Sequence, residues 1–103
     1  MEDMHHKCTE IAKYFGLDNQ CDQLVEECAE LIQAVNKRKR AKKDPVQHAL
    51  AMRNLVEEIA DVELMLDQVK FLLNITEDEL NENKQLKIDR TLDRIAKSKK
   101  EAC

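Results

Sequence analysis

The sequence has very little of the turn chemistry from which sheet proteins are built. Its 103 residues include one glycine, one proline, no tryptophan, one tyrosine and two phenylalanines. Because a sheet needs frequent turns, this composition argues against a β protein and favours a few long helices joined by short loops. At this length we expect a single domain, residues 1–103, with a small core.

Long hydrophobic runs are also missing. The first residues, MEDMHHKCTE, contain no apolar segment of the signal-peptide kind, and no run approaches the ~20 apolar residues of a membrane span. The net charge of −4 disfavours an anionic membrane or nucleic acid as a partner of the whole chain. We therefore expect a cytoplasmic protein with no membrane partner.

The four cysteines, at positions 8, 21, 28 and 103, form no Cys-x-x-Cys pair. Cys21 and Cys28 lie two helical turns apart, about 10 Å of rise, which is too far for a disulfide. We expect reduced, buried cysteines and no zinc site. His5 and His6 lack further ligands nearby and are weak evidence for a metal.

Hydrophobic periodicity predicts four helices. We expect them at about 3–15, 18–39, 46–73 and from 76 into the charged tail. Gly16 suits the left-handed position after the first helix, and Asp18 or Asn19 can cap the second. Asp44-Pro45 marks the start of the third, and the sequence TEDE at 76–79 is a capping box for the fourth.

The third helix is apolar on two sides. Its main stripe comprises Ala51, Leu55, Ile59, Val62, Leu66, Val69 and Leu73. Leu64 and Phe71 lie on nearly the opposite side, which the other helices of so short a chain can hardly cover. An apolar strip left in water is disfavoured, so we expect it to pack against a second copy. The predicted fold is an all-α bundle of about four helices, completed by dimerisation.

Two octets repeat an acidic pattern, LVEECAEL at 24–31 and LVEEIADV at 55–62. Each places two acids three residues apart, Glu27 with Glu30 and Glu58 with Asp61. Side chains at this spacing are ~5–6 Å apart on a helix, beside the apolar stripe. If the two helices pack antiparallel, the two pairs can face one another.

Four converging carboxylates repel one another strongly unless a cation lies among them. Oxygen ligands select magnesium, manganese or calcium over zinc, so the repeat predicts a divalent-cation site. The alternative is an ordinary solvated Glu-rich surface paired with lysines four residues on. The positions four residues after Glu27 and Glu58 hold Leu31 and Val62 instead of lysine, and this weakens that alternative.

The spaced motifs Glu-x-x-Glu and Glu-x-x-Asp resemble those of the MazG-like, all-α nucleoside triphosphate pyrophosphohydrolases. The resemblance spans roughly residues 20–95 and includes KIDRTLDRI at 87–95. It implies cleavage of a (deoxy)nucleoside triphosphate between the α and β phosphates, giving monophosphate and pyrophosphate. It also implies a homodimer or a dimer of dimers. By this resemblance the catalytic magnesium ligands, with manganese as a substitute ion, would be Glu27, Glu30, Glu58 and Asp61.

The phosphates also need cations from the protein. A basic stripe on the fourth helix is the candidate, comprising Lys84, Lys87, Arg90 and Arg94. A solvated face that pairs with Asp89 and Asp93 is an equally good interpretation of any one of these residues. The basic run at 37–43 can recruit phosphates too, although such a run is more often a solvated helix end.

Two functions from other classes compete with the hydrolase. One is a non-catalytic helical module that binds nucleic acid through the basic run at 37–43, and the other is a dimerising bundle without chemistry. The negative net charge, the three aromatic residues and the absence of a base-reading motif argue against nucleic acid.

Overall fold

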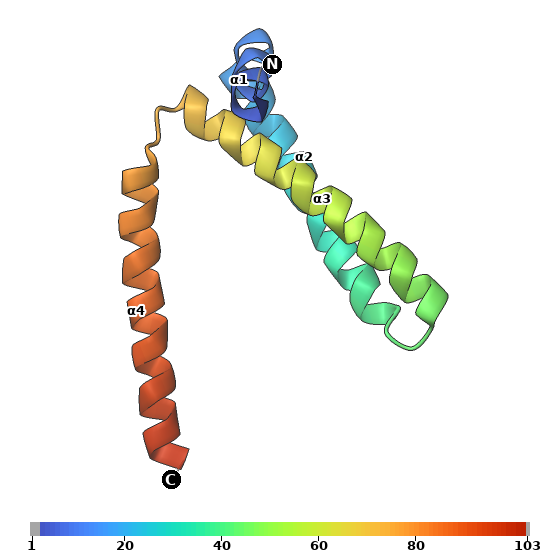
Figure 1. Cartoon of the computed structure of the whole chain (residues 1–103), viewed down its shortest axis with the longest axis vertical. Helices are drawn as coiled ribbons and strands as arrows, with labels where there is room; N and C mark the ends of the chain where they lie inside the picture. Colours follow the sequence, from blue (N-terminus) through green and yellow to red (C-terminus); the bar gives the residue numbers. More distant parts are fainter. Residues whose placement is uncertain (1–2, 103) are drawn as a thin grey trace.

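The computed structural model describes residues 3–102, and these form four α-helices without a strand. The helices are α1 (Met4–Phe15), α2 (Leu17–Arg40), α3 (Pro45–Leu72) and α4 (Glu77–Ala102). Figure 1 shows α2 and α3 side by side, α1 across one end of this pair, and α4 standing apart. The predicted all-α bundle and its four helices are confirmed.

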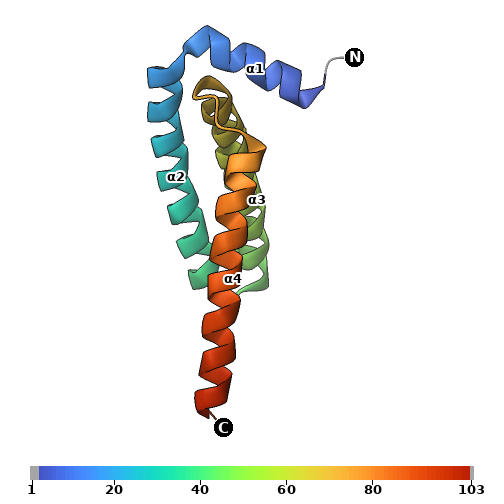
Figure 2. The ribbon, with the colours of Figure 1, turned by 90° about the vertical axis from the view of Figure 1, so that its left-hand side faces the viewer.

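α2 and α3 form an antiparallel hairpin closed by the short connection at 41–44 (Figures 1 and 2). Small side chains let the two helices approach closely, since Ala34 of α2 and Ala51 of α3 are both buried. The buried apolar set is completed by Cys8, Ala12, Val62, Met65 and Val69. Because the hairpin reverses direction, the acidic octets of α2 and α3 come to lie opposite each other.

A single glycine joins α1 to α2. Gly16 has φ 84° and ψ 169°, a backbone conformation that L side chains rarely adopt. Its N–H donates to the carbonyl of Ala12 at 2.9 Å, and its carbonyl accepts from the N–H of Gln20 at 3.1 Å. The predicted cap at Asp18 or Asn19 is wrong. α2 begins at Leu17 because Gly16 ends one helix and starts the next.

The other helix starts agree with the sequence. Asp44 accepts hydrogen bonds from the N–H groups of Val46 and Gln47, and Pro45 occupies the first turn of α3. At α4 the capping box is complete. The N–H of Glu79 donates to the Thr76 hydroxyl at 3.1 Å, and the N–H of Thr76 donates to the Glu79 carboxylate at 2.9 Å.

α1 packs against α3 and contacts its second apolar side only in part, because Leu64 and Phe71 remain 46% and 36% exposed. The expected packing of this strip against a second copy stays a prediction. The Cys8 thiol donates to the carbonyl of Leu64 at 3.5 Å, and the ammonium of Lys13 lies 5.8 Å from the Phe71 ring centroid. Burial raises the pKa of Cys8, and the charge of Asp67 adds to this. Cys8, Cys21 and Cys28 are free thiols, and Cys103 lies outside the described residues.

α4 points away from the other three helices after the segment that connects α3 to Glu77 (Figure 1). Lys70 of α3 forms an ion pair with Glu77 at 3.0 Å and another with Asp67 at 3.3 Å. Lys70 donates a hydrogen bond to the Glu77 carboxylate, which lowers the pKa of Glu77 and raises the pKa of Lys70. Within residues 3–102, α4 packs against no other helix. Its apolar residues Leu86, Ile88, Leu92 and Ile95 are exposed.

Candidate metal centre

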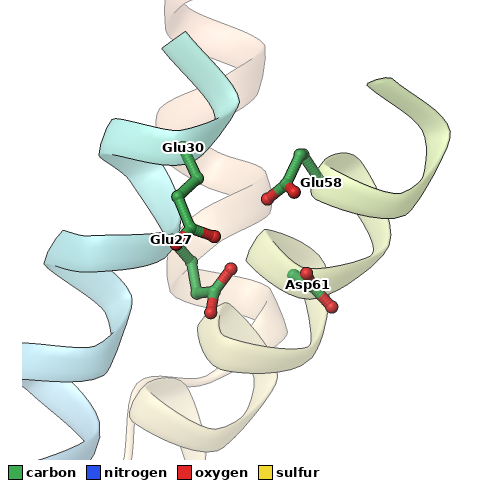
Figure 3. Close-up of side chains that lie close together, drawn as sticks. All are labelled: Glu27, Glu30, Glu58 and Asp61. Atoms are coloured by element: carbon green, nitrogen blue, oxygen red, sulfur yellow. The ribbon is translucent and has the colours of Figure 1, made fainter. Parts of the chain in front are cut away.

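The two acidic pairs meet across the hairpin. Glu27 and Glu30 project from α2, while Glu58 and Asp61 lie on the facing turns of α3 (Figure 3). One carboxylate oxygen from each residue can be chosen so that all four lie within 4.8 Å of one another. We call these four residues the acidic cluster. The three-residue spacing within each octet and the antiparallel packing together account for the convergence.

The acidic cluster contains carboxylate oxygens that lack a hydrogen-bond donor. Oε2 of Glu27 and Oε2 of Glu58 are both buried without a partner. The other oxygen of Glu27, Oε1, accepts from Nε2 of Gln23 at 3.0 Å. No ion pair within residues 3–102 involves any residue of the cluster. Buried anionic oxygens without donors are costly, and a bound cation removes that cost.

The donor set fits a divalent cation of the magnesium class. All four ligand candidates are carboxylates, hard anionic donors that Mg²⁺ and Mn²⁺ accept and that zinc uses less often than nitrogen or sulfur. Glu26 and Glu57, the neighbouring acids of the octets, are exposed and do not belong to the cluster. The helical register therefore selects two acids from each octet, as the sequence predicts.

The expected phosphate-binding residues are not gathered at this cluster. Lys84, Lys87, Arg90 and Arg94 are all exposed on α4, and α4 packs against neither α2 nor α3 within the described chain. Their role in phosphate binding stays a prediction. It requires α4 to contact the hairpin of this or another copy.

The sequence does not reveal a cavity that lies further along the same hairpin. This cavity has a volume of about 460 Å³ and lies between the end of α2 and the start of α3. Its lining includes Lys37, Arg40 and Asn54. The basic run at 37–43 is the available signal in the sequence, but only the fold separates the cations that face the cavity from those that do not.

Comparisons with known proteins agree with the geometry. A family model described as the MazG nucleotide pyrophosphohydrolase domain matches residues 15–101. No curated protein and no solved structure matches the chain. None of the helices in residues 3–102 combines the length with the hydrophobicity that a membrane span requires. The matched segment covers most of the chain and includes both acidic octets. The protein therefore belongs to the MazG nucleotide pyrophosphohydrolase domain family.

Proposed function

We propose that the protein is a Mg²⁺-dependent nucleoside triphosphate pyrophosphohydrolase that cleaves its substrate between the α and β phosphates. The observation that carries this proposal is the acidic cluster, in which four carboxylates converge from the two helices of a MazG domain. Two of its buried oxygens have no donor, which is the arrangement expected of residues that hold a cation. The product pair would be a (deoxy)nucleoside monophosphate and pyrophosphate.

The residues of the chain supply ligands and a proton acceptor. Glu27, Glu30, Glu58 and Asp61 would hold Mg²⁺, with Mn²⁺ as a substitute. The ion, when bound, supplies positive charge against the phosphates and makes water more acidic. One of the four carboxylates can accept the proton of the water that attacks the α-phosphorus. The new P–O bond forms as the bond from the α-phosphorus to the bridging oxygen breaks, and that oxygen leaves with pyrophosphate.

A homodimer or a dimer of dimers is part of the same proposal. Large apolar side chains are exposed on α2, α3 and α4, including Val25, Ile32, Val56, Leu66 and Leu92. Soluble proteins usually cover such surfaces with a partner, and a two-fold dimer is the commonest solution. In such an assembly α4 would find a packing surface, and its four basic residues could reach a substrate phosphate. We place this activity in the cytoplasm, in the control or cleaning of the nucleotide pool.

A panel of common and damaged nucleoside triphosphates, assayed for pyrophosphate release, tests the proposal. At least one substrate should be converted with Mg²⁺, and activity should vanish with EDTA and return with Mg²⁺ or Mn²⁺. A panel without turnover, or turnover that survives EDTA, would refute the proposal. Binding of nucleic acid without hydrolysis would favour the non-catalytic module.

A further inference from the structure

The cavity between the end of α2 and the start of α3 is lined by apolar side chains together with several polar and charged ones. Lys37 and Arg40 contribute from the end of α2, and Gln47 and Asn54 contribute from the first turns of α3. Its volume is about 460 Å³. No aromatic ring lines it, so it offers a nucleobase no surface for stacking.

The cavity and the acidic cluster lie along the same side of the hairpin. Asn54 precedes Glu58 on α3 by four residues, about 6 Å of helical rise. Lys37 follows Glu30 on α2 by seven residues, about 10 Å of rise, and two turns return it to the same helical face. By this register, a chain of phosphates that starts at the carboxylates would reach the cavity by running along this side of the hairpin. Figure 3 shows the carboxylates on the facing turns of the same two helices.

The cations in the cavity are available for an anion. Within residues 3–102 neither Lys37 nor Arg40 forms an ion pair, whereas Lys70 pairs with two carboxylates. The one acid of the lining, Asp44, uses its Oδ1 to accept two backbone N–H groups at the start of α3. Lys37 and Arg40 are three residues apart, so their side chains are neighbours on the helix. Two adjacent cations suit an anion with several oxygens.

We propose that this cavity binds the β- and γ-phosphates of the substrate, the part that leaves as pyrophosphate, through Lys37 and Arg40. The inference rests on the proposed function. When the bond to the α-phosphorus breaks, its electron pair stays on the bridging oxygen, so negative charge grows on the leaving group. Two cations fixed beside that group stabilise the charge as it develops. The nucleoside then lies on the other side of the acidic cluster, away from the cavity.

Titration calorimetry with magnesium pyrophosphate tests this assignment without any need for turnover. The double variant Lys37→Gln, Arg40→Gln should bind pyrophosphate about tenfold more weakly or worse than the unmodified protein, because two charge-assisted contacts are lost. The matched control is Lys39→Gln, Lys43→Gln, which removes the same charge from exposed residues that do not line the cavity. Its affinity should change by no more than about twofold.

Three results would overturn the assignment. The first is no binding of pyrophosphate by the unmodified protein. The second is equal affinity in the Lys37/Arg40 variant and the control. The third is that the Lys37/Arg40 variant loses affinity for nucleoside monophosphate while its affinity for pyrophosphate is unchanged, which would place the nucleoside in the cavity. Failure here differs from failure of the hydrolase. If the protein releases pyrophosphate from a triphosphate but the Lys37/Arg40 variant binds pyrophosphate as well as the control does, only this inference fails. If pyrophosphate binding depends on Lys37 and Arg40 but no triphosphate is hydrolysed, the hydrolase proposal fails and the cavity remains a pyrophosphate site.

Discussion

Each carboxylate of the acidic cluster has a defined position that its neighbours in the sequence do not share. We expect Glu27→Gln, Glu30→Gln, Glu58→Gln and Asp61→Asn each to lower triphosphate turnover by about two orders of magnitude or more, because each removes a hard anionic ligand from one shared ion. Calorimetric titration with Mn²⁺ should show weaker binding in the same variants. Steady-state kinetics with Mg²⁺ measures the loss of turnover.

The control for this series is Glu26→Gln, an exposed acid in the same octet as Glu27. It should retain most of the activity. In metal-free protein, Glu27→Gln and Glu58→Gln should increase the free energy of unfolding, since they relieve repulsion at buried oxygens without donors. Equal losses of activity at Glu26 and Glu27 would contradict the helical register on which the site depends.

A second residue-scale feature is the buried amide pair between α2 and α3. Nε2 of Gln20 donates to Oε1 of Gln68 at 2.6 Å, and both side chains are buried. Gln20→Ala should lower the free energy of unfolding by about 1–3 kcal/mol, because the amide oxygen of Gln68 loses its donor in a buried place. Urea denaturation measures this. The double change Gln20→Leu, Gln68→Leu removes both polar groups and should cost less than Gln20→Ala, and a larger cost would contradict the explanation.

At the scale of helices, the segment from Lys70 to Glu79 determines where α4 begins. Hydrogen bonds from the N–H and hydroxyl of Thr76 lower the pKa of Glu79, and the hydrogen bond from Lys70 lowers the pKa of Glu77. A lowered pKa in the folded state means that each carboxylate stabilises this segment above its ordinary pKa. That contribution is lost as the pH falls through the lowered value.

We therefore expect the first turn of α4 to fray in acid before α2 and α3 lose structure. Backbone NMR shifts between pH 6 and pH 2 would report it as a loss of helical shifts confined to residues near Thr76. Thr76→Ala should produce the same fraying at neutral pH, since loss of an N-cap hydroxyl typically costs about 1 kcal/mol, or about fivefold in the fraying equilibrium. Fraying that is independent of pH and unaffected by Thr76→Ala would contradict this interpretation.

Local chemistry explains which helices the sequence predicts well. Short-range hydrogen bonds at Asp44-Pro45 and at the Thr76–Glu79 capping box fix the starts of α3 and α4. Both starts can therefore be predicted from the sequence. The acidic cluster is also predictable, because three-residue spacing on two neighbouring helices leaves few arrangements. The placement of α1 against α3 depends on the turn at Gly16, and the separation of α4 depends on long-range packing. No periodicity in the sequence encodes either one.

For the whole molecule, the exposed apolar surface makes association the expected state. Light scattering at low micromolar concentration should give a mass of at least twice the 12.0 kDa of one chain. Ile32 of α2 and Leu66 of α3 are 63% and 43% exposed in the single chain. The double change Ile32→Glu, Leu66→Glu should dissociate or aggregate the protein, because charges then replace apolar contacts. Ile32→Val with Leu66→Met keeps the surface apolar and should keep the assembly. A clean 12.0 kDa mass for the unmodified protein would contradict this expectation.

The central claim is that the acidic cluster directs water to the α-phosphorus of a nucleoside triphosphate. The most direct measurement is ³¹P NMR of the products formed with Mg²⁺ in ¹⁸O-enriched water, using the best substrate of the panel. Attack at the α-phosphorus places the label in the nucleoside monophosphate and leaves pyrophosphate unlabelled, and this is the result we predict. Label in pyrophosphate, or nucleoside diphosphate with orthophosphate as the products, would show that a different bond is attacked and would contradict the proposed reaction.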